Sequence, residues 1–149
     1  MKGIHLIVVG KLKDKNLESL EADYLKRIKN PSLIIHEVKS CEERLDEEAF
    51  EVIKKIDSIG KGRIILLAEK GKQFDSPEFS KWIFSHLEVN QNLFLVIGGA
   101  SGHGQAIQER ADECISLGKL TYPHKLARLL LVEQIYRGVT IRDGHPYHK

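Results

Sequence analysis

The sequence has few of the residues that mark a disulfide-rich or membrane-spanning protein. Its 149 residues include only two cysteines, Cys41 and Cys114, whose wide separation matches no metal-binding or redox motif. We therefore expect two inert thiols and a protein that needs no oxidising compartment. The apolar run Ile4–Val9 is too short to cross a membrane, and the lysine-rich stretch that follows it at once argues against a signal peptide. The expected location is the cytoplasm.

Several catalytic signatures are missing as well. The sequence contains neither the G-x-G-x-x-G order of a dinucleotide-binding loop nor a phosphate loop ending in Lys-Ser/Thr. It also lacks the G-x-S-x-G pattern of esterases and a defensible pair of catalytic carboxylates. His145 and His148 lie close together, but no set of carboxylates or cysteines accompanies them, so we expect no metal site.

The charge is unevenly distributed along the chain. The formal net charge is only +2, yet residues 117–149 contain six Lys/Arg and two Asp/Glu, while residues 1–116 contain 17 and 19. Three of the seven histidines also belong to the basic end. This surplus favours an acidic partner such as nucleic acid, although a solvated basic tail would look the same.

Apolar runs of strand length alternate with segments of helical spacing, which predicts one α/β domain over residues 1–149. Because each expected strand is a nearly continuous apolar run, we expect a mostly parallel sheet covered by helices on both faces. In such sheets, ligands bind beyond the carboxyl ends of the strands. The expected strands are Ile4–Val9, Leu33–Val38, Ile64–Ala68, Leu93–Ile97 and Cys114–Leu117.

Three loops at the ends of expected strands have the composition of a ligand site. They are Leu67–Lys72, the glycine-rich Gly98–Gly102, and Leu117–Tyr122. Glycines let the backbone approach a ligand closely, and a loop of apolar side chains with free backbone groups could hold a flat heterocycle. A plain strand-to-helix turn, and a loop that only precedes the next helix, remain alternatives for the second and third loops.

The segment after Pro123 is the most apolar helix of the sequence, and Pro123 is expected at its first position. Its apolar residues cover nearly the whole circumference, so we expect the helix to be buried on all sides, partly by a second copy of the chain. Its charged residues form two i,i+4 pairs, His124 with Arg128 and Glu133 with Arg137. The apolar residues are Leu126, Ala127, Leu129, Leu130, Leu131, Val132 and Ile135.

An ordered series of segments makes a distinctive pattern along the second half of the chain. These segments, together with Arg128, resemble the RlmH family of SPOUT-class methyltransferases, which act on large-subunit ribosomal RNA, and the resemblance extends over the whole chain. The segments are Leu67–Lys72, Asp75–Phe79, Phe94–Gly102, Leu120–His124, Glu133–Arg137 and His145–Lys149.

The resemblance implies a SPOUT-type α/β fold with a C-terminal trefoil knot, a homodimer, and S-adenosylmethionine as methyl donor. The implied acceptor is N3 of a pseudouridine in 23S rRNA of the ribosome. Gly118 departs from the family, whose members commonly have Ser there. The donor-binding residues that the resemblance implies are Leu67, Gly98, Leu117, Gly118, Lys119, Leu120, Thr121 and Tyr122.

Methyl transfer to N3 requires removal of its proton, and the basic end of the chain offers groups for this step. We hypothesise that Arg137, Tyr147 and His148 surround the target base next to the donor pocket, with His148 or a water as proton acceptor. For Arg137 the alternative is a structural pair with Glu133. Residues expected to hold RNA are Arg128, Arg142 and Lys149.

Two other functions stay open at this point. A non-catalytic ribosome- or RNA-binding module with a degenerate pocket is the main rival, and Gly118 is the feature that hints at it. An α/β enzyme acting on a small nucleotide is disfavoured by the missing phosphate loop and by the basic tail.

Overall fold

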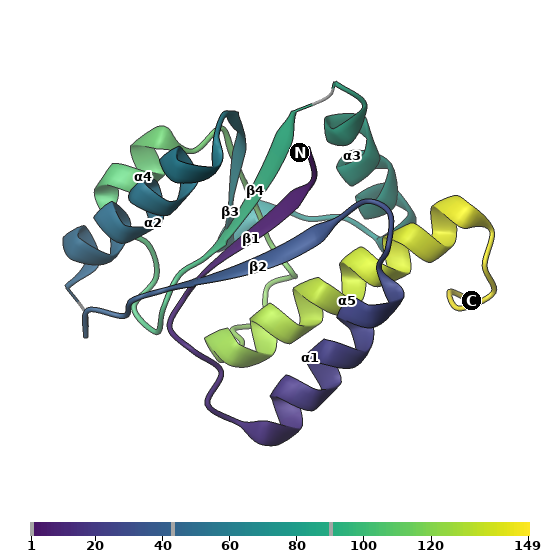
Figure 1. The fold of residues 1–149 in the computed structure, drawn as a ribbon, viewed down its shortest axis with the longest axis horizontal. Coiled ribbons are helices and arrows are strands. Elements are labelled where there is room, and N and C mark those ends of the chain that lie inside the picture. Colours follow the sequence, from purple (N-terminus) through teal and green to yellow (C-terminus); the bar gives the residue numbers. More distant parts are fainter. Residues whose placement is uncertain (1, 43, 90) are drawn as a thin grey trace.

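A five-stranded parallel sheet with helices on both faces forms the framework of the molecule. The computed structural model describes residues 2–42, 44–89 and 91–149 (Figure 1). The strand order is β2-β1-β4-β3-β5, and every pairing is parallel. The elements in chain order are β1 (Ile4–Val9), α1 (Lys15–Arg27), β2 (Leu33–Val38), α2 (Leu45–Ile59), β3 (Gly62–Lys72), α3 (Ser76–Glu88), β4 (Asn92–Ile97), α4 (Gln105–Arg110), β5 (Glu113–Ile115) and α5 (His124–Asp143).

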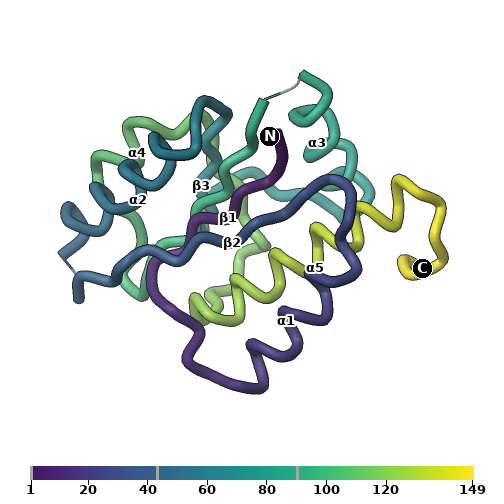
Figure 2. Tube along the Cα trace, viewed as in Figure 1, coloured from purple at the N-terminus to yellow at the C-terminus, as the bar shows by residue number. Residues whose placement is uncertain are grey.

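The helices divide into two groups that enclose the sheet, as the trace in Figure 2 shows. α1, α3 and α5 cover one face, and α2 and α4 cover the other (Figure 1). Every residue of β1 and β4 is buried, as expected for central strands that are covered on both sides. The predicted α/β fold is thus confirmed, whereas the knot implied by the resemblance stays a prediction. Within the described part of the chain, no helix is both long and apolar enough to cross a membrane.

The third strand is longer than its sequence suggests. Residues from Leu67 to Lys72 were expected to form a loop, but β3 continues through them. Both Leu67 and Lys72 are in register with Ile115 of β5, so the residues between them bulge away from the partner strand. Gly71 makes the return possible, because a Cβ there would lie only 2.3 Å from the carbonyl carbon of Ile115. β5 also begins and ends slightly earlier than expected.

Helix α5 is less enclosed than its composition predicts. The side chains of Leu131, Val132 and Ile135 are buried in the core, but Leu126 and Leu130 are 42% and 39% exposed. The expectation of burial on all sides is therefore wrong for a single chain, because α1 and α3 cover only part of the helix circumference. The helix also begins one residue later than expected, with Pro123 as its N-cap.

Arg128 of α5 lies at the centre of a buried ionic cluster. Its Nε and Nη2 donate to the carboxylate of Glu21 in α1 at 2.7 and 2.9 Å, and its Nη1 donates to Glu37 in β2 at 2.7 Å. Burial alone would lower the pKa of Arg128, but these hydrogen bonds raise it overall. The expectation that Arg128 binds phosphate, or pairs with His124, is thereby corrected. Its guanidinium is engaged in holding α5 to α1 and to the edge strand.

Replacing Arg128 by methionine should therefore destabilise the fold. Arg128→Met leaves the Glu21 carboxylate buried without its partner, which costs about 3–5 kcal/mol in comparable cases. The free energy of unfolding can be measured by urea denaturation. The matched control is Arg110→Met, since Arg110 pairs with Asp57 at a similar distance of 2.9 Å but with side chains 45% and 58% exposed. In that control the free energy of unfolding should fall by less than about 1 kcal/mol. Equal small losses in both variants would contradict a structural role for Arg128.

Candidate functional site

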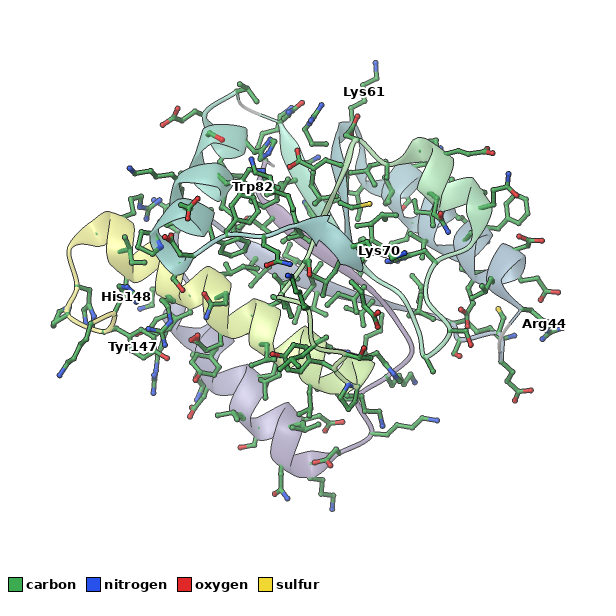
Figure 3. All side chains as sticks on the ribbon, turned by 180° about the vertical axis from the view of Figure 1, so that it is seen from behind. Arg44, Lys61, Lys70, Trp82, Tyr147 and His148 are labelled. Atoms are coloured by element: carbon green, nitrogen blue, oxygen red, sulfur yellow. The ribbon has the colours of Figure 1, made fainter. Side chains whose placement is uncertain are left out.

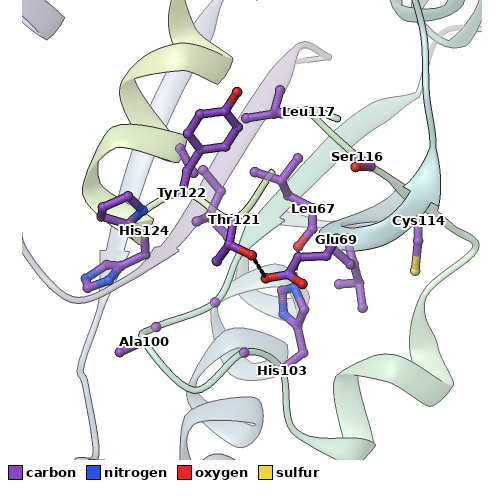
Figure 4. Close-up of a pocket in the computed structure, with 18 of the residues that line it drawn as sticks. Leu67, Glu69, Ala100, His103, Cys114, Ser116, Leu117, Thr121, Tyr122 and His124 are labelled. Carbon is purple, nitrogen blue, oxygen red and sulfur yellow. Dashed lines mark hydrogen bonds between the residues drawn. The ribbon is translucent and has the colours of Figure 1, made fainter. Parts of the chain in front are cut away.

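A cavity of about 970 Å³ opens at the carboxyl edge of the sheet (Figure 4). Three segments that are distant in sequence line it: residues 66–69 of β3, the glycine-rich loop after β4, and the loop between β5 and α5. The sequence-based expectation that these segments meet is confirmed. The lining residues include seven of the expected donor-binding residues: Leu67, Gly98, Leu117, Gly118, Leu120, Thr121 and Tyr122.

The loop after β4 borders the cavity with its backbone. A Cβ on Gly98 would lie 2.4 Å from the carbonyl oxygen of Gly102, so a side chain at this position would displace the loop. Gly99 and Gly102 close the loop through an antiparallel bridge, and Gly102 has a φ of +91°, which favours glycine. The glycines therefore permit close backbone packing between Gly98 and Gly102 in the wall of the cavity.

Two side-chain hydrogen bonds join the three segments. Thr121 Oγ1 donates to Glu69 Oε1 at 3.0 Å, which connects the β5–α5 loop to β3 (Figure 4). His103 Nε2 lies 2.8 Å from the carbonyl oxygen of Leu67 and connects the glycine-rich loop to β3. Sequence reasoning missed both Glu69 and His103 as members of the site. The sequence feature that could have pointed to His103 as a site residue is its position directly after Gly102, the last residue of the glycine-rich loop.

The loop from Leu117 to Tyr122 is organised around Gly118. Ser116 Oγ accepts from the Gly118 N–H at 3.0 Å and donates to the Gly118 carbonyl at 2.7 Å. Gly118 has a φ of +126°, a conformation that a serine would adopt only with strain. This is a physical reason for the departure from the family pattern. Lys119 is exposed and does not line the cavity, contrary to expectation.

The chemistry of the cavity is mainly apolar and backbone-based. Besides Glu69, its titratable lining groups are His103, His124, Cys114 and Tyr122. Burial lowers the pKa of His103 below its ordinary value, which keeps this imidazole neutral near pH 7. Among the residues that the structure describes, no cluster of three or more His, Cys, Asp or Glu side chains could hold a metal ion. Such a cavity suits a heterocyclic ligand bound by main-chain groups and flat apolar contacts.

The expected catalytic residues form a second cluster, at the far end of α5. Gly144 ends the helix in the left-handed conformation, and the chain then folds back so that Tyr147 packs on Tyr136. Arg137 Nη1 lies 3.0 Å from His148 Nδ1, and the Arg137 guanidinium stacks over the Tyr147 ring at 4.8 Å.

Glu133 holds this cluster to the helix. Arg137 Nε donates to Glu133 at 3.1 Å, so the i,i+4 pair considered from the sequence is present. The hydroxyl of Tyr147 donates to the other oxygen of Glu133 at 3.3 Å. The pKa of Tyr147 is raised, first by burial and also by the negative charge of Glu133, so its phenol stays protonated.

Within one chain, this cluster does not lie next to the cavity. His124 lines the cavity at the first turn of α5, and the 13 residues from there to Arg137 correspond to roughly 20 Å of helix. Figure 3 shows Tyr147 and His148 apart from Lys70, which belongs to the segment that follows Leu67. The expected adjacency is thus wrong for a single chain, because the straight helix separates its two ends.

The two remaining residues expected to bind RNA lie near the same end of α5. Arg142 donates to the Asn30 carbonyl at 2.8 Å and to Asp143, and its guanidinium lies over the Phe84 ring. Lys149 is exposed at the end of the chain. Both residues therefore belong to the end of the chain that holds Arg137, Tyr147 and His148 (the Arg137 cluster), and neither lines the cavity.

Comparisons with known proteins agree on one family. A family model described as "Predicted SPOUT methyltransferase" matches residues 1–148. The sequence is 42% identical to a protein of Enterococcus faecalis named Ribosomal RNA large subunit methyltransferase H, with 98% of this chain and 99% of that protein covered. A protein of the same name from Synechococcus is 38% identical, with 98% of this chain and 94% of that protein covered.

The fold has a counterpart among solved structures. The crystal structure of the SpoU methyltransferase AviRb from Streptomyces viridochromogenes, in complex with AdoMet, aligns with a TM-score of 0.51 at 14% identity. The alignment covers 97% of this chain but only 59% of AviRb, and at this identity it supports the fold alone. Since the family model covers nearly the whole sequence and the named relatives match along their length, this chain belongs to the SPOUT methyltransferase family.

Proposed function

We propose that this protein is an S-adenosylmethionine-dependent methyltransferase that modifies N3 of a pseudouridine in 23S rRNA. The proposal rests on one observation: β3 and the loops after β4 and β5 build one common cavity. The relatives of this chain are named as large-subunit rRNA methyltransferases. We expect it to act in the cytoplasm, where ribosomes are found. The rival RNA-binding module loses its main support, because Gly118 has a conformational reason to be glycine.

The cavity has the features that S-adenosylmethionine requires. When bound, this donor supplies a methyl group on a positively charged sulfonium. The backbone of Gly98 lines the cavity, and because it carries no side chain it would let the donor approach closely. Leu117 and Tyr122 offer apolar surface for the adenine, and backbone groups of this loop offer hydrogen bonds. Glu69 is the carboxylate in the lining and favours a cationic ligand.

Arg137, Tyr147 and His148 can act on the acceptor base, and the hydrogen bonds among them decide which atoms can donate or accept a proton. Arginine can only donate, so the lone pair of His148 Nδ1 accepts from Arg137, and a neutral His148 carries its proton on Nε2. In this arrangement His148 and Arg137 are donors that stabilise an N3 anion through the neighbouring carbonyl oxygens, and a water takes the proton. Tyr147, protonated and packed on Tyr136, offers a flat surface for the base.

A homodimer would bring the cavity and the cluster together. One chain holds them roughly 20 Å apart, a distance that direct methyl transfer cannot bridge. Leu126 and Leu130 of α5 are exposed, as is Leu120 at 71% in the loop before the helix. Leu130 lines one pocket together with Tyr122, and these apolar residues offer a contact for a second copy. In a two-fold dimer, the tail of each chain would complete the cavity of its partner.

Donor binding is the first test. Calorimetry of the wild-type protein with S-adenosylmethionine should detect binding, and Gly98→Ala should weaken it at least about tenfold, because the loop must shift to admit the methyl group. Gly138→Ala is the matched control, since its Cβ would meet Ser80 at an ordinary 3.5 Å. It should bind the donor as the wild type does. Absence of binding by the wild type at millimolar donor would favour the RNA-binding module.

The shared active site predicts a specific pattern of complementation. His148→Ala should bind the donor normally but lose methylation of ribosomes. When Gly98→Ala and His148→Ala chains are co-expressed, half of the dimers are mixed and each has one intact site, so about a quarter of wild-type activity should return. If the tail acted on the cavity of its own chain, every site in the mixture would be defective. No recovery of activity would therefore refute the shared site.

The substrate can be tested in cells. Mass spectrometry of 23S rRNA from a strain that lacks this protein should show a pseudouridine in place of N3-methylpseudouridine, a mass loss of one methylene. Expression of the wild-type chain should restore the methyl group, and expression of Gly98→Ala should restore it poorly because the donor loop is displaced. Unchanged methylation in the deletion strain would refute the proposed substrate.

A further inference from the structure

His103 lines the cavity and has no role in the methyl transfer proposed above. It follows the glycine-rich loop directly, and its ring reaches across to β3 (Figure 4). The Nε2 atom lies 2.8 Å from the Leu67 carbonyl oxygen. A carbonyl can only accept, so Nε2 must carry the proton. In the neutral ring, the other nitrogen, Nδ1, is therefore an acceptor.

The Nδ1 atom lies against the backbone of Gly98, and both residues line the cavity. It lies 3.2 Å from the position that a Cβ on Gly98 would occupy. Over residues 2–42, 44–89 and 91–149, no hydrogen-bond donor is paired with it. It is not among the buried side-chain atoms without a partner in the described residues, which are His5 Nε2 and Asn92 Oδ1, and His103 lines the cavity. An unused acceptor thus borders the cavity at Gly98.

The surroundings keep this acceptor available near neutral pH. Burial lowers the pKa of His103, so the ring is neutral and its Nδ1 lone pair is free. The other titratable groups that border the cavity are Glu69 of β3, Cys114 of β5, Tyr122 of the β5–α5 loop and His124 of α5. On the α2 side, the buried carboxylate of Glu48 lies beside Gly99. Protonation of Nδ1 would remove the acceptor and add a positive charge to the cavity.

We propose that His103 Nδ1 accepts a hydrogen bond from an N–H or O–H group of the bound methyl donor, either a ribose hydroxyl or the ammonium of its amino-acid part. This assignment rests on the proposed function. His103 then has two roles through its two nitrogens. Nε2 positions the end of β3 through Leu67, and Nδ1 contacts the ligand.

Two substitutions separate these roles. His103→Gln places an amide near the position of Nε2, so it can keep the bond to Leu67 but loses the acceptor at Nδ1. His103→Asn places an amide oxygen near the position of Nδ1, so it keeps the acceptor but is too short to reach Leu67. The test is calorimetry with S-adenosylhomocysteine, which has the same polar hydrogens as the donor and does not react.

The glutamine variant should bind roughly threefold to tenfold more weakly than the wild type, and more weakly than the asparagine variant. Because burial lowers the pKa of His103, wild-type affinity should stay constant down to about pH 6.5 and fall only at a lower pH, where Nδ1 becomes protonated. The glutamine variant should lack this fall. Wild-type affinity in the glutamine variant, or an acid-dependent fall that the glutamine variant shares with the wild type, would overturn the assignment.

His86→Asn is the matched control. His86 also has a pKa lowered by burial, but it packs against Trp82 on α3 and does not line the cavity. Its variant should keep both the affinity and the pH profile of the wild type. If it lost the acid-dependent fall, that fall would belong to His86, and the assignment to His103 would be refuted.

A second ligand identifies which hydrogen is bound. 5′-Methylthioadenosine has the ribose hydroxyls but no amino-acid part. If the glutamine variant weakens both ligands, His103 contacts a hydroxyl; if it weakens only S-adenosylhomocysteine, His103 contacts the ammonium. The outcomes also separate the two proposals. A wild-type protein that binds neither ligand refutes the proposed function, whereas binding that is insensitive to both substitutions refutes only the role of His103.

Discussion

The pairing of one residue, Ile115, with two residues of β3 shapes the site. Both Leu67 and Lys72 align with Ile115, so the four residues between them must leave the plane of the strand pair and return. Glu69 belongs to this bulge and Leu67 directly precedes it, so this part of β3 lines the cavity. Gly71 permits the return because no Cβ fits against Ile115. The hydrogen bonds from Thr121 and His103 then attach the other two segments to this one.

The carboxyl-edge location of the cavity follows from local sequence patterns. In a parallel sheet all strands end at one edge, so apolar runs followed by glycine-rich or polar loops are enough to predict that Gly98 and Leu117 meet. The bulge in β3 is different, because it depends on a strand more than 40 residues further along the chain. The same holds for His103, whose partner is 36 residues away, and for Arg128, whose acidic partners are 107 and 91 residues away. Charge on a helix predicts that a partner exists, but not whether that partner is a phosphate or a buried carboxylate.

The tail shows how nearness in sequence can mislead. Arg137 and His148 follow the cavity loop closely along the chain, yet a helix of 20 residues is a rod of about 30 Å. The apolar circumference of α5 predicted that a second copy of the chain would help to cover the helix, but not which of its leucines a single chain leaves exposed. Leu126 and Leu130 look the same in sequence as the buried Leu131, and only the packing of α1 and α3 distinguishes them.

The separation of the cavity from the basic tail has an electrostatic logic. The proposed donor carries a positive sulfonium, and a nearby cluster of Arg137, Arg142 and Lys149 would repel it. At roughly 20 Å, more than twice the Debye length at physiological salt, that repulsion is screened. In the proposed dimer the tail of the partner chain would lie beside the cavity instead, and the phosphates of bound RNA would neutralise the charge of that tail. Donor binding and RNA binding would then reinforce each other, because the bound RNA removes the charge that opposes the donor.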